Sequence, residues 1–232
     1  MKNNSKKIVL FIVEGISDKD SLELLIKKAF AHKNFIFEVV NGDITADKNS
    51  STNNIKKKLT DIVQAGGRNK FMPSDYEEII HLIDIDGVFL DEEHIYLDPA
   101  LEKFVYKEDG IYSSDRQKVI DRNKAKRKII EMLISTKRIF KKVNYSIYFF
   151  SSNLEHVLHN IIDAEDSDKE DLALRFQDEY YENIEEFLSF MCQSEFSINK
   201  NYEESWKYIT EIQDKIIRAS NFNLVIEKYE NE

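Results

Sequence analysis

The stretch IVLFIVEG, residues Ile8–Gly15, decides the fold of this chain together with a second stretch, IIHLIDIDG, residues Ile79–Gly87. Each is a run of mostly apolar residues that ends in acidic ones, which is typical of a buried strand with carboxylates at its carboxyl end. In parallel sheets these ends meet at one rim, where ligands and metals bind. We therefore expect Glu14, Asp84 and Asp86 to form one cluster.

The chemistry of this cluster favours a divalent cation. Three neighbouring carboxylates repel one another and raise each other's pKa unless a cation neutralises them. Oxygen ligands of this kind indicate Mg²⁺ or Mn²⁺ rather than zinc. The single Cys192 excludes a cysteine-based zinc site within the chain. His156 and His159 share a helix face but have no third soft ligand nearby, so we expect them to be hydrogen-bonding surface or boundary residues instead.

Length and composition indicate one domain, or one domain with an appendage. Of the 232 residues, 42% are hydrophobic, which is enough for a sizeable core. The longest apolar run, Ile8–Val13, is far too short to span a bilayer. Because Glu14 follows it at once, we interpret the run as a strand rather than a signal peptide and expect a cytoplasmic protein without a membrane partner.

The formal net charge of -10 argues against a protein that coats nucleic acid through general electrostatics. It does not argue against a nuclease, because a metal-binding site made of carboxylates is itself acidic. The charge is also uneven, since residues 116–142 are strongly basic and residues 163–204 are mostly acidic. The basic segment would either hold a phosphate backbone or simply form a solvated helix face.

Strand and helix signals alternate along the chain. We expect strands at 8–13, 35–40, 77–83 and 145–150 and helices at 17–30, 55–66, 122–140 and 154–162. This order predicts an α/β fold with a central parallel sheet of about four strands and helices on both faces. Residues 88–114 are expected to form a long loop or a small insertion. Ser17 and Asp20 have the spacing of a capping box at the first helix.

The rest of the chain, from 169 to 229, is predicted to be helical and to pack on one side of the sheet. The acidic run at 165–168 is the best boundary before it. We therefore predict a catalytic domain over residues 1–162 and an acidic helical appendage over residues 163–232.

The element order resembles the TOPRIM fold, a Rossmann-like metal-binding module of topoisomerases, bacterial-type primases and several nucleases. The resemblance covers the first two-thirds of the chain and rests on Glu14-Gly15, Ser17-Asp18 and Asp84–Gly87. It implies that Glu14 acts in acid/base or metal chemistry and that Asp84 and Asp86 bind the divalent metal.

Within this fold, the chain is most similar to nucleases of the overcoming-lysogenization-defect (OLD) type and their stand-alone relatives in phage defence. That resemblance implies that Asp18 and Glu155 serve a second metal. Acids in a first helical turn are also favoured by the helix dipole without any catalytic role. Lys124 and Lys126, expected at the start of the helix over 122–140, are candidates to stabilise negative charge that develops during the reaction.

These resemblances imply a Mg²⁺- or Mn²⁺-dependent nuclease that cleaves DNA or RNA by two-metal hydrolysis and acts as the toxic effector of an anti-phage, abortive-infection system. The sequence has no Gly-x-x-x-x-Gly-Lys-Ser/Thr loop. ATP hydrolysis would therefore come from a partner, an ABC or SMC-like ATPase, and the chain could also form a homo-oligomer. Two alternatives stay open: an RNA-maturation nuclease of the ribonuclease M5 type, and a non-catalytic TOPRIM-fold binding or regulatory module.

Overall fold

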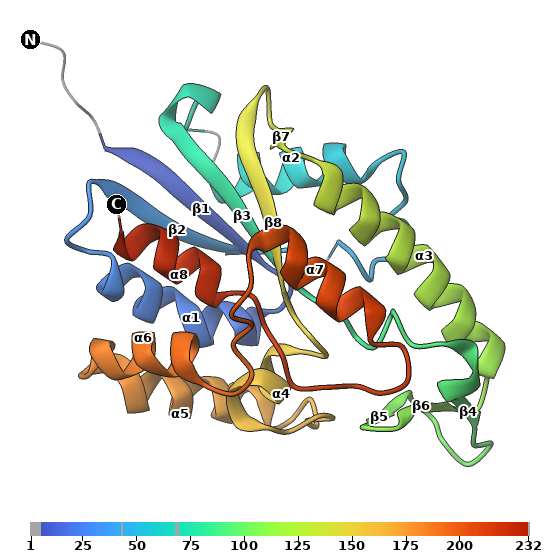
Figure 1. The fold of residues 1–232 in the computed structure, drawn as a ribbon. Helices are drawn as coiled ribbons and strands as arrows, with labels where there is room; N and C mark the ends of the chain where they lie inside the picture. Colours follow the sequence, from blue (N-terminus) through green and yellow to red (C-terminus); the bar gives the residue numbers. More distant parts are fainter. Residues whose placement is uncertain (1–5, 43, 68–69, 232) are drawn as a thin grey trace, which may run out of the picture.

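A computed structural model describes residues 6–42, 44–67 and 70–231, and it has an α/β architecture with a five-stranded mixed sheet at its centre (Figure 1). Four neighbouring strands are parallel, as predicted, and a short fifth strand runs antiparallel at one edge. In spatial order the strands are β2 (Phe35–Asn41), β1 (Lys7–Val13), β3 (Tyr76–Asp84), β8 (Val143–Phe150) and β7 (Arg138–Ile139).

Helices cover both faces of this sheet because successive side chains of each strand point to opposite faces. Leu10 and Ile12 of β1 join a buried cluster that includes residues of α2 (Ile55–Gly66) and α3 (Arg116–Ser135). Phe11 and Val13 join a second cluster on the other face with α1 (Ile16–Ala29) and α4 (Leu154–His159). Among the helices of the described ranges, none combines the length and the apolar character needed to cross a bilayer.

Helix α3 differs from its predicted range of 122–140. It begins at Arg116, where the carboxylate of Asp115 caps it by accepting a hydrogen bond from Lys118 N at 3.0 Å. It ends at Ser135, and Phe140, Lys141 and Lys142 instead have positive φ angles of 39°, 56° and 85° in the tight turn between β7 and β8. Lys124 and Lys126 therefore lie in the body of the helix and not at its start.

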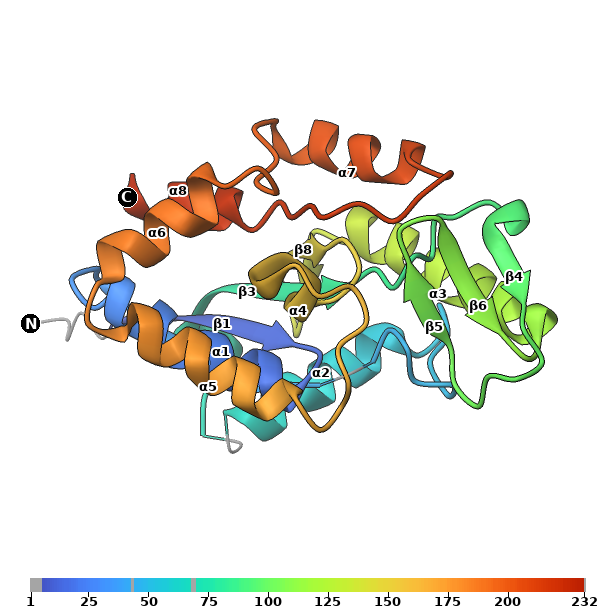
Figure 2. The same cartoon turned by 90° about the horizontal axis from the view of Figure 1, so that it is seen from below.

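Residues 88–114 contain more regular structure than the long loop or small insertion that was predicted. They form a 3₁₀ turn (Glu92–His94) and a second sheet in the order β4 (Ile95–Leu97), β6 (Gly110–Ser113), β5 (Val105–Lys107). This small sheet lies against α3 at one end of the molecule (Figure 2). Gly110 is required there, because a Cβ atom at that position would lie 2.0 Å from the carbonyl oxygen of His94.

The C-terminal segment is helical, as predicted, with α5 (Lys169–Tyr181), α6 (Ile184–Gln193), α7 (Tyr202–Glu211) and α8 (Asn223–Glu230). The prediction that these helices cover one side of the sheet is wrong. Trp206 of α7 belongs to the cluster that contains α2 and α3, whereas Phe176 of α5 and Val225 of α8 belong to the cluster on the α1 face. The segment thus completes both cores, and its division from residues 1–162 as a separate unit stays a prediction.

Candidate functional site

The predicted acidic residues lie at the carboxyl ends of the parallel strands. Glu14 directly follows β1, Asp84 ends β3, and Asp86 lies two residues beyond it in a turn. Asp18 is in the first turn of α1, and Glu155 is in the first turn of α4, which follows β8. Because β1, β3 and β8 are adjacent and parallel, all five carboxylates occur at one rim of the sheet.

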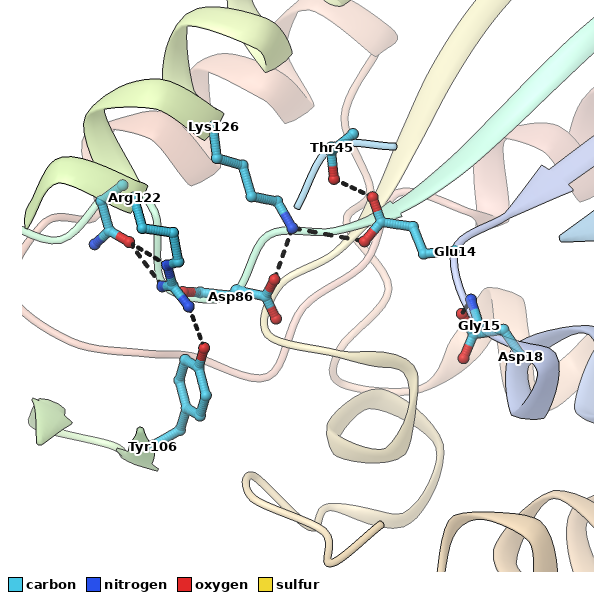
Figure 3. A network of polar contacts seen from close by, with 9 residues as sticks. Glu14, Gly15, Asp18, Thr45, Asp86, Tyr106, Arg122 and Lys126 are labelled. Atoms are coloured by element: carbon cyan, nitrogen blue, oxygen red, sulfur yellow. Dashed lines mark hydrogen bonds and ion pairs between the residues drawn. The ribbon is translucent and has the colours of Figure 1, made fainter. Parts of the chain in front are cut away.

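Lys126 reaches into this rim from α3 (Figure 3). Its ammonium nitrogen lies 2.6 Å from Asp86 Oδ2 and 3.5 Å from Glu14 Oε2, and its side chain is 1% exposed. Burial alone would lower the pKa of Lys126, but the charges of Asp86 and Glu14 outweigh burial and hold that pKa above its ordinary value. Lys126 is therefore a protonated, buried cation between two carboxylates.

The turn that carries Asp86 is fixed by backbone hydrogen bonds. Asp86 and Gly87 both have positive φ angles, 53° and 63°. The amide of Asp86 donates to Ser152 O at 2.9 Å, and the guanidinium of Arg122 donates to Asp86 O at 2.9 Å. Burial raises the pKa of Asp86, but the charges of Lys126 and Arg122 outweigh it, so the net shift is downward and the carboxyl group stays ionised.

Glu14 is buried and has a second partner besides Lys126. The hydroxyl group of Thr45 donates a hydrogen bond to Glu14 Oε1 (Figure 3). Thr45 is itself buried and lies shortly after β2, the strand on the other side of β1. Sequence reasoning missed Thr45, although its place after a strand at the same rim was a usable signal.

Asp84 and Asp18 are the carboxylates of the cluster whose negative charge is least compensated by positive groups. Asp84 Oδ1 is buried and has no hydrogen-bond partner among the described residues. Burial, followed by the charges of Asp18, Glu14 and Asp86, raises the pKa of Asp84 well above its ordinary value. Burial also raises the pKa of Asp18 to about 6, and the charge of Glu155 adds to this shift. Both carboxyl groups therefore ionise at a higher pH than an ordinary aspartate.

Asp18 has a structural contact as well. Its Oδ2 atom accepts a hydrogen bond from Gly15 N at 2.7 Å, so Gly15 and Asp18 form the helix start that was predicted for Ser17 and Asp20. That prediction is wrong because α1 begins at Ile16. A Cβ atom at position 15 would lie 3.2 Å from Asp18 Oδ2, and glycine therefore lets the carboxylate approach the backbone closely.

Glu155 joins the rim through α1 and interacts with a second cation. Its Oε1 atom accepts a hydrogen bond from the hydroxyl group of Ser17 at 3.4 Å. Burial lowers the pKa of Lys169 at the start of α5, but the charges of Glu155, Asp166 and Asp84 reverse the shift to a net increase. Lys169 belongs to the C-terminal segment, and no local sequence pattern connected it with residues so far away.

Lys124 and the histidines lie outside this network of contacts. The side chain of Lys124 is 62% exposed, and its ammonium pairs with Glu92 at 2.8 Å. His81 is a core residue, with Nδ1 2.9 Å from the hydroxyl of Tyr145. The expectation for His156 is wrong: it is buried, and its Nδ1 has no hydrogen-bond partner among the described residues. Burial lowers its pKa to about 4, which keeps it neutral.

The donor atoms of the rim are of the type that binds a hard divalent ion, but their present arrangement fits such an ion only in part. Its oxygen donors, and the unpartnered Oδ1 of Asp84 in particular, are of the kind that Mg²⁺ and Mn²⁺ prefer. Within residues 6–42, 44–67 and 70–231, however, no three His, Cys, Asp or Glu side chains are arranged to hold one ion. Binding would require the carboxylates to rotate toward one another.

A cavity of about 720 Å³ lies elsewhere, along the edge strand β2. Its charged lining residues largely neutralise one another, as in the pairs of Lys27 with Glu23 and Glu38 at 2.8 and 3.0 Å. None of the five rim carboxylates lines it. Because buried, uncompensated charge marks functional sites more specifically than volume does, we take the rim as the candidate site.

Comparison of the chain with protein-family models, with curated proteins and with solved structures returns no match.

Proposed function

We propose that this protein is a metal-dependent nuclease with a TOPRIM-like catalytic domain, which hydrolyses phosphodiester bonds of DNA or RNA. The observation that carries the proposal is the gathering of five carboxylates with a buried lysine at the carboxyl ends of three adjacent parallel strands. Burying charges in this number costs stability, so the arrangement calls for a functional reason. The carboxyl rim of a parallel sheet is also where open α/β folds bind their ligands.

Each residue then has a chemical part in the reaction. Bound Mg²⁺ or Mn²⁺ would supply an activated water and stabilise the leaving oxygen. Asp84, Asp18 and Glu155 offer oxygen ligands. The raised pKa values of the two aspartates fit carboxyl groups whose negative charge a bound cation would neutralise. Glu14 is placed to orient or deprotonate the attacking water. Lys126 supplies a fixed positive charge for the oxygens of the reacting phosphate.

The proposed cellular role is that of a toxic effector in an anti-phage system, switched on by a partner ATPase. The chain has no phosphate-binding loop of its own for ATP hydrolysis. The acidic helical segment that follows residue 162 is the proposed docking surface for that partner.

One observation favours a second candidate, a non-catalytic module that has kept the fold. Lys126 already neutralises Glu14 and Asp86 directly, and no ligand triad is formed among the described carboxylates. A module of this kind would need no divalent ion.

Cleavage assays with a matched pair of variants distinguish the two. Wild type is incubated with Mn²⁺ or Mg²⁺ and with single- and double-stranded DNA and RNA, alone and with any ABC or SMC-like ATPase found encoded beside it. We expect Glu14→Gln to abolish cleavage and Glu77→Gln, an exposed glutamate on β3, to leave it intact. Equal inactivity of all three proteins, together with equal toxicity in cells, would replace the nuclease by the binding module.

A further inference from the structure

The carboxylate cluster has two sides that differ in how their charge is compensated. On the lysine side, defined by Glu14 and Asp86, the ammonium of Lys126 contacts both carboxylates. On the open side, defined by Asp18, Asp84 and Glu155, no Lys or Arg of the described residues comes within ion-pairing distance of any of the three. Figure 3 shows Asp18 on the far side of Glu14 from Lys126.

Lys126 is held on its side of the cluster. It projects from the middle of α3, where Asn123 one turn earlier donates to Gly87 O at 3.4 Å and Arg127 donates to Val88 O at 2.9 Å. These bonds join α3 to the chain directly after Asp86. Lys126 therefore cannot withdraw without either moving the helix or leaving its own charge buried and unpaired, which is costly.

A divalent ion bound to Glu14 and Asp86 would compete for the oxygens that Lys126 already uses. Asp86 Oδ2 is 2.6 Å from the ammonium, and an ion on the same atom would lie within a few ångströms of that positive charge. Repulsion between such charges is strong in a buried site, and the guanidinium of Arg122 adds to it. Occupation of this side by Lys126 and by an ion is therefore mutually exclusive.

The open side has the opposite character. Asp84 Oδ1 is buried and lacks a hydrogen-bond partner among the described residues. The only hydrogen bond that the Asp18 carboxylate accepts in the described ranges comes from Gly15 N. Once the carboxylates have rotated toward one another, a cation there would meet unsatisfied oxygen and no ammonium in direct contact, since Lys169 acts on this side only from beyond ion-pairing distance.

We propose that this chain binds one divalent ion and no second, on the open side, and that the Lys126 ammonium takes the place of the second ion on the lysine side. The inference rests on the proposed function for the presence of the ion. In place of hydrolysis by two metal ions, it gives a reaction in which one of the two positive charges is the Lys126 ammonium, which is part of the protein. Lys126 would then contribute to the site whether or not the ion is bound.

The test is a count of bound Mn²⁺ by calorimetry and by electron paramagnetic resonance, without nucleic acid. We expect one ion per chain for wild type and two for Lys126→Met, because the freed Glu14 and Asp86 can then bind an ion. Lys124→Met is the matched control, since Lys124 is exposed on the same helix and pairs only with Glu92 among the described residues, and it should bind one. Two ions in wild type would overturn the proposal.

Two further variants keep the test decisive if Lys126→Met does not fold. Asp84→Asn should weaken Mn²⁺ binding more than about tenfold. Asp86→Asn should change the affinity less than about twofold, because Lys126 and not the ion occupies that side, whereas equal weakening by both variants would overturn the proposal. Cleavage is measured separately. A chain that binds one ion and cleaves nothing upholds the single-ion inference and contradicts the proposed nuclease function. A chain that binds two ions and cleaves nucleic acid supports the nuclease function and contradicts the single-ion inference.

Discussion

The ammonium of Lys126 lies 2.6 Å from the carboxylate of Asp86 and joins helix α3 to the turn that follows the central strand β3. The Lys126 side chain is 1% exposed, whereas that of Asp86 is 22% exposed. Its main consequence is that a buried group of carboxylates is stable at all, because unpaired charges of one sign would repel one another strongly there. The same pair also fixes where a metal ion can and cannot be accommodated.

Removing the lysine charge should destabilise the fold. Lys126→Met leaves the buried Glu14 and the partly buried Asp86 without their cation, and the loss of one partner of a buried ion pair costs about 3–5 kcal/mol. Unfolding by urea without metal measures the free energy of unfolding. Lys124→Met should stay within about 0.5 kcal/mol of wild type, because its ion pair is exposed. Equal changes in the free energy of unfolding for the two substitutions would show that Lys126 does not stabilise the fold in this way.

The raised pKa of Asp18 predicts a specific dependence of stability on pH. Between 3.8, the ordinary value, and about 6, the folded protein holds a proton on Asp18 that the unfolded chain releases. The Asp18 contribution to stability is therefore present in full at low pH and is lost as the pH rises through this window. A shift of this size corresponds to at most about 3 kcal/mol.

The measurement for Asp18 is the free energy of unfolding at several pH values, for wild type and for Asp18→Asn. The asparagine can still accept the hydrogen bond from Gly15 N but carries no titrating group. The difference between the two proteins should change in favour of wild type as the pH falls. A difference that does not vary with pH would contradict the burial of an ionisable Asp18.

A divalent ion and a substitution at Asp84 should have opposite effects on thermal stability. Without metal, Asp84→Asn should raise the melting temperature, because it removes a carboxyl group that repels Asp18, Glu14 and Asp86. With Mn²⁺ at 100 times its dissociation constant, wild type should gain about 2.7 kcal/mol and the variant much less. Thermal unfolding with Mn²⁺ or with a chelator tests both, and an equal Mn²⁺ response in the two proteins would place the ion elsewhere.

Thr45 should position Glu14 for its part in the reaction. Thr45→Val keeps the shape of the side chain and removes the hydroxyl group that donates to Glu14 Oε1. Loss of a hydrogen bond to a charged group costs about 1.5–3 kcal/mol, so we expect a loss of stability and a change in the pH profile of any cleavage. Thr60→Val, on helix α2 and away from the rim, is the control. A Thr45→Val variant with the stability and pH profile of wild type would leave Thr45 without a part at the site.

Much of the site was predictable because its carboxylates belong to short local patterns. A buried strand that ends in an acid places this acid at the rim, and Glu14, Asp84 and Asp86 follow such strands here. Asp18 and Glu155 lie within one turn of the helices that start at the same rim. The identification of the fold as TOPRIM-like, by contrast, stays a proposal, since the same α/β order is compatible with other Rossmann-like folds.

The partners of these carboxylates were harder to predict because they are distant in the sequence. Lys124 and Lys126 are equivalent as sequence, yet only Lys126 points into the cluster, because residues two apart on a helix face different directions. The placement of Thr45 and Lys169 depends on how β2 and α5 pack. The small sheet β4-β6-β5 was missed because its strands are only three or four residues long and give little periodic signal.

The sequence by itself determined the parallel strands, the order of the helices up to α4 and the rim on which the acidic side chains gather, since these follow from the alternation of apolar and polar residues along neighbouring positions. Only the tertiary structure decided that Lys126 neutralises Glu14 and Asp86 while Asp84 keeps an unpartnered oxygen, and that the C-terminal helices complete the cores on both faces of the sheet. The physical reason is that charge pairing and core packing depend on the distance in space between side chains, and local sequence patterns do not specify that distance for residues far apart in the chain.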